Sequence, residues 1–426
     1  CVKGDATVTP DEAIPDRVTY EFSFTNTLTG ITSHSLHKSW KDADSGGYER
    51  PDLYLTLYRY LKADARNYPD TPVEELGSYQ AFTDCSDPVW YVADAYHWRA
   101  EVTDLPLYDE QGREYAYRFQ ETMNNEGKTV HGTYVQTAEY DVQACETCNS
   151  FNKTYLKPYD KFTNTLTASI TVSGEKTWKG FEGYQIDPKD YPTPTIELYR
   201  SLTTVNLLNK SSEEIEGLVN DKTIELVASK TLTPGEGGRY FYSFTQEGEG
   251  LAGFNSATAP GLPKFDPEGR RYVYAIYERM PDAITDQLYT EESVSGTLTN
   301  TFRRDVNRRS IAVTKTWLGR DNLKDGEKVY PSITYTLYRY EKGADPENAK
   351  ELQVQRVPAA DVKANAETPE ETRQPLCTFT DLLIYSPSGK QYCYYITEGS
   401  IHGYEISYTD ENGSDDSNGR SDVISV

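Results

Sequence analysis

The sequence predicts an all-β protein built from tandem sandwich modules, and three observations carry this prediction. Among the 426 residues, aromatic side chains make up 12%, with 35 Tyr and 5 Trp, and Tyr is favoured on pleated, half-buried surfaces. The apolar stretches alternate with polar residues instead of recurring at helical spacing, which is the pattern of strands. Four motifs also recur in the same order with a mean period of about 138 residues, which is long enough for one domain per repeat.

The charge balance narrows the partners that such a protein can have. Asp and Glu number 67 against 43 Lys and Arg, which gives a formal net charge of −24. Nucleic acid and anionic membranes would repel a chain of this charge. No apolar run approaches the roughly 20 residues of a membrane span. The composition therefore favours a secreted all-β protein over a helix-rich enzyme.

The first two motifs mark strands near the start of each repeat. A Lys lies two residues before a Trp at Lys38, Lys176 and Lys315, and these positions are 138 and 139 residues apart. A second strand-like segment follows each time: PDLYLTLYR, PTPTIELYR and PSITYTLYR. In all three segments a Pro precedes a Tyr by seven residues. The order of the two motifs is the same in every copy, and 13, 16 and 16 residues separate the Lys from the Pro.

The other two motifs mark strands near the end of each repeat. YAYRFQE, YVYAIYE and YCYYITE each end on a Glu, and the hairpin signals DEQGRE, DPEGRR and SPSGKQ precede them. These acids are Glu121, Glu278 and Glu398. A T-N-T tripeptide gives the fourth match, at Asn26, Asn164 and Asn300. Short strands at regular spacing with such turns predict an Ig-like sandwich for each repeat; the segment 212–220 predicts one short helix.

These matches divide the chain into four parts with almost no linker between them. Asn164 lies only 12 residues before Lys176, and Asn300 only 15 before Lys315. We therefore expect the modules to form a semi-rigid, elongated rod. The expected parts are 1–29 (the last strand of a preceding module or a donor strand), 30–167 (module 1), 168–303 (module 2) and 304–426 (module 3, without a last strand of its own).

Side-chain alternation predicts that polar residues enter the core. Side chains two residues apart on a strand share a face, and Phe162 and Leu166 flank Asn164 at that spacing. Leu298 and Phe302 flank Asn300 in the same way. The same alternation places each motif Glu among Tyr, Phe and Ile side chains, and each motif Lys beside its Trp. Each complete module is thus expected to bury one Lys, one Glu and one Asn.

A buried Lys–Glu–Asn trio has two possible fates. Burial in an apolar core costs free energy unless the groups satisfy one another, and it shifts both ionisable groups toward neutrality. A neutral amine is a nucleophile, and a protonated Glu could hydrogen-bond to the Asn carbonyl and polarise it. Attack would form a Lys–Asn isopeptide bond and release ammonia. The alternative is a hydrogen-bonded trio without covalent chemistry.

The sequence contains an ordered set of motifs: K-[ST]-W, P-x-[IL]-x-[LIY]-x-L-Y, FTDL, Y-x-Y-x-I-x-E and T-N-T. This set resembles the collagen-adhesin B-type (CnaB) repeat of Gram-positive surface proteins and pilins. The resemblance spans nearly all of residues 30–426, and the segment ITEGSIHGY is similar to the E-box of pilins. It implies an isopeptide bond between the first and last strands, assisted by a buried acid. Carried onto this sequence, the bonds are Lys38–Asn164 with Glu121 and Lys176–Asn300 with Glu278.

The resemblance also implies a function. We expect a structural protein of the bacterial cell surface, extracellular, that serves as a pilus or filament shaft or as an adhesin stalk. Its only chemistry would be single-turnover bond formation in its own core, without a cofactor or a metal. The alternative function is an adhesin module, in which the aromatic-rich insertion 79–98 of module 1 binds a glycan or a host matrix protein.

The third copy departs from the pattern. Lys315 and Glu398 are present, but no T-N-T follows before Val426, whereas Asn26 precedes every motif Lys. One explanation is a longer repeat array, with the partner Asn beyond Val426. The other is strand donation, in which residues 18–28 complete module 3 of a neighbouring subunit and Asn26 bonds to its Lys315. That head-to-tail contact would build an open filament.

The cysteines carry a separate prediction. Six Cys suit an oxidising exterior. Cys377 and Cys393 flank a predicted hairpin, which suggests a disulfide between them. Cys145 and Cys148 form a C-x-x-C that is expected to be a local disulfide, because a zinc site needs four ligands and the five His are scattered.

Overall fold

The structure is a computed structural model in full atomic detail. It describes residues 6–10, 18–43, 49–63, 74–80, 89–92, 94–130, 132–142, 158–184, 186, 190–233, 240–294, 296–324, 326–408 and 421–423. The chain forms two compact units, which are Cys1–Ile170 with Pro263–Tyr272, and Thr171–Leu262 with Val273–Val426.

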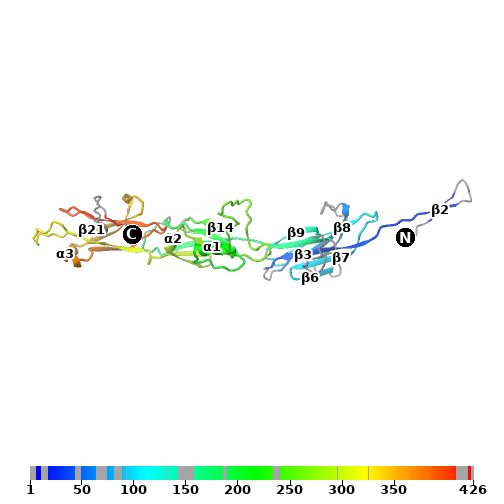
Figure 1. Cartoon of the computed structure of the whole chain (residues 1–426), viewed down its shortest axis with the longest axis horizontal. Helices are drawn as coiled ribbons and strands as arrows, with labels where there is room; N and C mark the ends of the chain where they lie inside the picture. The colour runs from blue at the N-terminus through cyan, green and yellow to red at the C-terminus, as the bar shows by residue number, and fades with distance from the viewer. Residues whose placement is uncertain are drawn as a thin grey trace. The chain divides into compact units, whose positions relative to one another are not determined.

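The first unit contains a two-layer sandwich and an N-terminal hairpin (Figure 1). Its strands are β1 (Ala6–Pro10), β2 (Val18–Phe22), β3 (Ile31–Lys41), β4 (Asp52–Leu61), β5 (Glu74–Gln80), β6 (Val89–Val92), β7 (His97–Pro106), β8 (Tyr115–Asn124), β9 (Thr133–Val142), β10 (Tyr159–Thr167) and β11 (Ser169–Ile170). One sheet has the order β6-β7-β3-β10-β9 and the other β5-β4-β8, while β1 pairs with β2.

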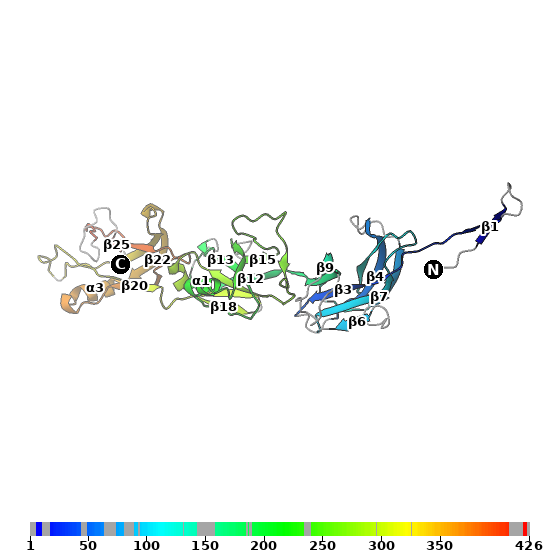
Figure 2. The same cartoon turned by 45° about the vertical axis from the view of Figure 1, so that its right-hand side comes forward.

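The second unit contains two further pairs of sheets (Figure 2). Its strands are β12 (Val172–Lys179), β13 (Thr195–Ser201), β14 (Glu225–Thr231), β15 (Tyr240–Phe244), β17 (Val273–Arg279), β18 (Tyr289–Val294), β19 (Thr297–Phe302), β20 (Arg308–Val313), β21 (Ile333–Glu341), β22 (Lys350–Val357), β23 (Cys377–Leu383), β24 (Tyr392–Glu398) and β25 (Ser421–Val423); the short β16 (Leu262–Pro263) lies at the boundary of the units. The first pair of sheets is β15-β12-β19-β18 with β14-β13-β17, and the second is β20-β23 with β22-β21-β24-β25.

The described helices are short. They are α1 (Ser212–Asn220), α2 (Ala283–Gln287) and α3 (Ala359–Glu367), with 3-10 turns at Pro346–Asn348 and Glu370–Thr372. The predicted helix over 212–220 is confirmed. It begins at a capping box, in which the Ser211 hydroxyl accepts from the Glu214 N–H and the Glu214 carboxylate accepts from the Ser211 N–H.

Alternation along the strands produces the core. In β4, Leu53, Leu55 and Leu57 are at most 2% exposed and pack toward the opposite sheet. In β10, Phe162 and Leu166 are buried on the same face. This period-two burial, repeated in all three pairs of sheets, confirms the predicted all-β fold of tandem sandwich modules. The exact module boundaries stay a prediction.

Parallel pairing joins the first and last strands of modules 1 and 2. Strand β10 lies parallel to β3, and β19 lies parallel to β12, so each module's ends meet inside one sheet. In module 3 the equivalent first strand is β20. Within the described residues, β20 pairs with β23 alone, and its other edge has no strand beside it.

Candidate functional site: the buried Lys–Glu–Asn trios

In module 1 the three predicted residues meet in the core. Lys38 on β3 and Asn164 on β10 belong to one sheet, and Glu121 on β8 reaches them from the other. Lys38 Nζ lies 3.0 Å from Glu121 Oε1 and 2.9 Å from Oε2. Asn164 Nδ2 donates to the same Oε1 at 2.6 Å. All three residues are buried, so the carboxylate bridges the amine and the amide away from water.

Module 2 repeats this geometry with its own residues. Lys176 on β12 donates from Nζ to Glu278 Oε2 at 2.8 Å. Asn300 on β19 donates from Nδ2 to Glu278 Oε1 at 3.1 Å. Across the parallel strand pair, Asn164 lies opposite Trp40, and Asn300 lies opposite Trp178. In both modules this Trp follows the Lys by two residues. The identical register brings the same three side chains together, although the Lys and the Glu are 83 residues apart in module 1 and 102 apart in module 2.

The Trp of each first motif covers the amine. Lys38 Nζ lies 4.5 Å from the centre of the Trp40 ring, and Lys176 Nζ lies 4.5 Å from the centre of the Trp178 ring. The ring face attracts a cation, but it also excludes water from the amine. The Lys-x-Trp motif therefore supplies both the buried amine and one wall of its surroundings.

Burial shifts the ionisable groups toward their neutral forms. It lowers the pKa of Lys38 to about 8, although Glu121 opposes this shift. Burial also lowers the pKa of Lys176 and raises the pKa of Glu278, and each of these two groups opposes the shift of the other. A proton passed from the amine to the acid would leave a neutral amine and a protonated Glu, which is the combination that attack on an amide requires.

The carboxylate faces the amide nitrogen in both modules, and this differs from the sequence-based expectation of a Glu that polarises the carbonyl. Asn164 Oδ1 and Asn300 Oδ1 have no hydrogen-bond partner. Glu121 and Glu278 instead contact both the Lys Nζ and the Asn Nδ2 of their own module. The arrangement suits an acid that takes a proton from the amine and delivers it to the departing amide nitrogen.

Module 3 contains two of the three groups. Lys315 Nζ lies 2.9 Å from Glu398 Oε1, and the Lys315 side chain is 16% exposed, against 0% for Lys38 and Lys176. Lys315 lies just beyond β20. Asn26, its predicted partner from a neighbouring subunit, is exposed on the segment that follows β2. The pairing of these two residues therefore stays a prediction.

The predicted Cys377–Cys393 disulfide is wrong, because both residues are free thiols. Cys377 begins β23, which pairs with β20, whereas Cys393 lies in β24, which pairs with β21. Cys377 is also six residues before the end of β23 at Leu383, about 20 Å along a strand, while Cys393 is next to the turn. A disulfide needs Cα atoms within about 7 Å.

The other cysteine pair and the aromatic-rich insertion that the sequence singled out lie largely outside the described residues. Cys145 and Cys148 lie outside the described residues, as does much of the aromatic-rich insertion 79–98. Among the residues that are described, no group of three or more His, Cys, Asp or Glu is arranged to hold a metal ion. In the same part of the chain, no helix is long and apolar enough to cross a membrane.

Sequence reasoning missed two contributors to the sites. The chain has only 2 Met, and each contacts the amide of a trio: Met123 Sδ lies 3.2 Å from Asn164 Nδ2, and Met280 Sδ lies 3.9 Å from Asn300 Nδ2. Both Met follow the motif Glu by two residues, a signal that was present in the sequence.

The second missed contributor is Glu291, the Cα partner of Asn300 on β18. It lines a pocket of about 250 Å³ together with Glu278, Met280 and Asn300. Burial, reinforced by Glu278, raises the pKa of Glu291 to about 7. Module 1 has Gln136 at the equivalent position opposite Asn164.

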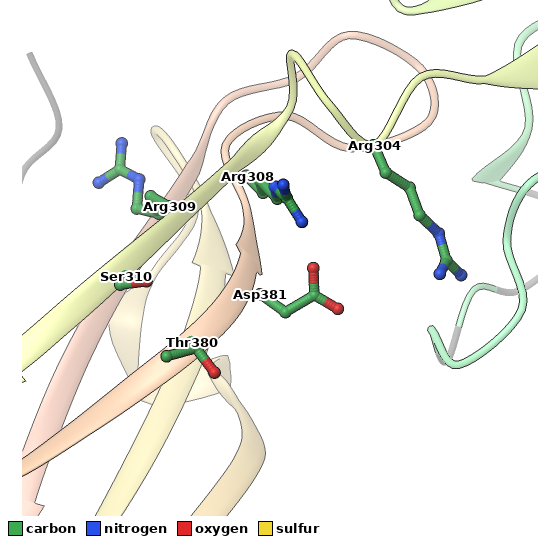
Figure 3. Close-up of a pocket in the computed structure, with 6 residues that line it drawn as sticks. All are labelled: Arg304, Arg308, Arg309, Ser310, Thr380 and Asp381. Atoms are coloured by element: carbon green, nitrogen blue, oxygen red, sulfur yellow. The ribbon is translucent and has the colours of Figure 1, made fainter.

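A second pocket, of about 520 Å³, is lined by Arg304, Arg308, Arg309, Ser310, Thr380 and Asp381. Arg304 and Arg308 lie on the same side as Asp381, whereas Arg309 extends to the other side of its strand (Figure 3). The Asp381 carboxylate accepts a hydrogen bond from the Tyr184 hydroxyl at 3.1 Å. This lining has a positive charge but contains no Lys, Glu or Asn, so it is separate from the trios.

The chain is similar in sequence to a known domain family. The family model of the Cna protein B-type domain matches residues 34–143 and 311–418, which together make up half of the chain. The chain belongs to the Cna B-type domain family. The two matched ranges fall in modules 1 and 3, and the trio of module 2 repeats the geometry of module 1. No curated protein sequence matches this Cna B-type chain.

Solved structures with similarity to this Cna B-type chain include two B repeat units of the collagen-binding protein of Staphylococcus aureus, at 18% identity, 96% coverage of this chain, 78% of that chain and a TM-score of 0.30. The pilus adhesin SpaC of Lactobacillus rhamnosus GG matches at 11% identity, 84% and 34% coverage and a TM-score of 0.22. The shaft pilin SpaA of the same organism matches at 11% identity, 64% and 98% coverage and a TM-score of 0.15.

Proposed function

We propose that this protein is a structural component of the bacterial cell surface, a pilus or filament shaft or an adhesin stalk, whose modules cross-link themselves. The observation that carries the proposal is the bridging carboxylate. Glu121 and Glu278 each contact both the amine and the amide nitrogen of their own module, in two independent copies. An acid in this position can pass a proton from the amine to the amide nitrogen, a transfer that bond formation requires.

The proposed reaction balances within each module. Lys Nζ forms a bond to Asn Cγ, and the bond from Cγ to Nδ2 breaks. The proton lost by Nζ passes through the Glu to Nδ2, which leaves as ammonia. The Glu is regenerated, but the Lys and the Asn are consumed, so each site reacts once.

The bond would serve a mechanical purpose. It joins the first and last strands of a module, so tension passes between modules through covalent bonds. The loop that it closes cannot open while the bond is intact, and this slows unfolding. Intact-mass spectrometry tests the proposal: the chain is expected to weigh less than its calculated mass by two ammonias, and Lys176→Ala is expected to keep one of these losses. The full calculated mass would overturn the proposal.

Assembly by strand donation is the second part of the proposal. Phe22, Phe24 and Leu28 are 60%, 74% and 54% exposed, and together with the exposed Asn26 they repeat the alternation seen in β10. In β10 the equivalent Phe162 and Leu166 are buried. The segment thus presents the core face of a last strand without a sandwich to cover it.

The complementary surface is the edge of β20, which lacks a neighbour on one side among the described residues. A strand added there in parallel, as β10 adds to β3, would bring its Asn beside the Lys315–Glu398 pair. Asn26 of one subunit would then bond to Lys315 of the next, giving a head-to-tail filament. Ladders that survive boiling in a denaturing gel would support this assembly, and complete collapse to monomers would contradict it.

A further inference from the structure

The two Met contacts within the trios have a shared geometry that the bond-forming chemistry explains. Met123 follows Glu121 by two residues on β8, and Met280 follows Glu278 by two residues, directly after the end of β17 at Arg279. Since side chains two apart share a face of a strand, each thioether lies beside its acid. With only 2 Met in 426 residues, the placement of both next to a reactive amide is specific. Module 3 has Ser400 at the same offset.

The contacts distinguish the two ends of the amide. A thioether sulfur is an acceptor without a donor hydrogen. The Asn164 amide therefore presents its nitrogen to Met123 Sδ at 3.2 Å, and the same nitrogen donates to Glu121 at 2.6 Å. The two hydrogens of the NH₂ group thus have one acceptor each. In module 2, Asn300 makes the same pair of contacts, at 3.9 Å to sulfur and 3.1 Å to carboxylate.

The opposite orientation of the amide would lose both contacts. A 180° rotation about the last side-chain bond exchanges oxygen and nitrogen, so the carbonyl oxygen would face the sulfur, and two acceptors would meet without a hydrogen between them. In the observed orientation the Asn Oδ1 atoms have no hydrogen-bond partner. Sulfur and carboxylate together therefore select the orientation in which the leaving nitrogen faces the acid.

We infer that Met123 and Met280 are positioning residues for isopeptide formation, which hold the leaving nitrogen of Asn164 and Asn300 against the acid that protonates it. The inference rests on the proposed self-cross-linking. The sulfur takes no part in the exchange of bonds; it raises the fraction of molecules in which the Glu can deliver its proton to Nδ2. Without it, the amide would spend more time with its oxygen toward the acid, and ammonia would leave more slowly.

The test follows bond formation in newly synthesised full-length chain by time-resolved intact-mass spectrometry. Met280→Leu nearly conserves side-chain volume but removes the acceptor. We expect it to slow ammonia loss from module 2 on the order of three- to tenfold, the effect of a weak hydrogen bond. Met123→Leu should slow module 1 by more, because its contact is shorter. In each variant the unaltered module provides the internal reference rate, and peptide mapping assigns each loss.

A second measurement separates positioning from packing. Once the reaction is complete, the Leu variants should unfold at the temperature of the parent protein, although they reacted more slowly. Parent-like rates in both variants would overturn the inference while leaving the cross-link in place. A lower unfolding temperature of the fully reacted variants, in proportion to the slower rate, would also overturn it. Absence of ammonia loss from the parent would instead refute the proposed function itself.

Discussion

Replacing the acceptor amide of module 2 should prevent the cross-link and leave Lys176 and Glu278 as a buried ion pair. In Asn300→Ala, Lys176 still donates to Glu278 at 2.8 Å, so no buried charge is left unpaired. The bond would close a loop of 124 residues, the difference between positions 300 and 176. Loop-closure entropy for this length is worth about 5 kcal/mol.

Calorimetry and mass spectrometry measure the two consequences. A loss of about 5 kcal/mol corresponds to a fall of about 10–20 °C in the unfolding temperature of a unit of this size, and the variant should retain one ammonia loss, that of module 1. Asn164→Ala is the matched control, since it should affect the first unit and retain the loss of module 2. If Asn300→Ala showed both ammonia losses, or unfolded with the parent, the reasoning would be refuted.

Three further predictions concern ionisation and assembly. In Asn164→Ala, Lys38 remains an amine with a pKa of about 8 in the folded state, below its ordinary value of 10.5. Between pH 8 and 10.5 the unfolded chain therefore binds more protons than the folded chain, so resistance to urea should rise with pH. The cross-linked parent should show no such rise. Burial raises the pKa of Glu291, so its ionisation opposes folding above pH 4.5, and Glu291→Gln should gain more stability against urea at pH 8 than at pH 5. Asn26→Ala should abolish the boiling-resistant ladders of assembled protein, while the monomer should still lose two ammonias through its internal bonds. Persistent ladders would exclude Asn26 as the acceptor for Lys315.

The trios were predictable because they depend on strand geometry alone. Side chains alternate on any strand, so Phe162 and Leu166 were enough to place Asn164 in the core, and the repeat supplied the matching Lys and Glu. The orientation of the amide was not predictable. It depends on Met123 and Glu121 together, and their distances from Asn164 follow from how two sheets pack.

The disulfide prediction failed for a related physical reason. The turn between Cys377 and Cys393 is present, with Tyr385 and Gln391 bridged across it. The strands on either side of that turn belong to opposite sheets. Sequence patterns reveal a turn, but they do not reveal whether the two strands pair with each other or separate into two layers. The distance between the thiols depends on that choice.

The most direct test of the central claim is fragmentation mass spectrometry of proteolysed mature protein. The account predicts two branched peptides, one that links Lys38 to Asn164 and one that links Lys176 to Asn300, each lighter by one ammonia than the sum of its linear parts. Recovery of all four residues in unmodified linear peptides would contradict it.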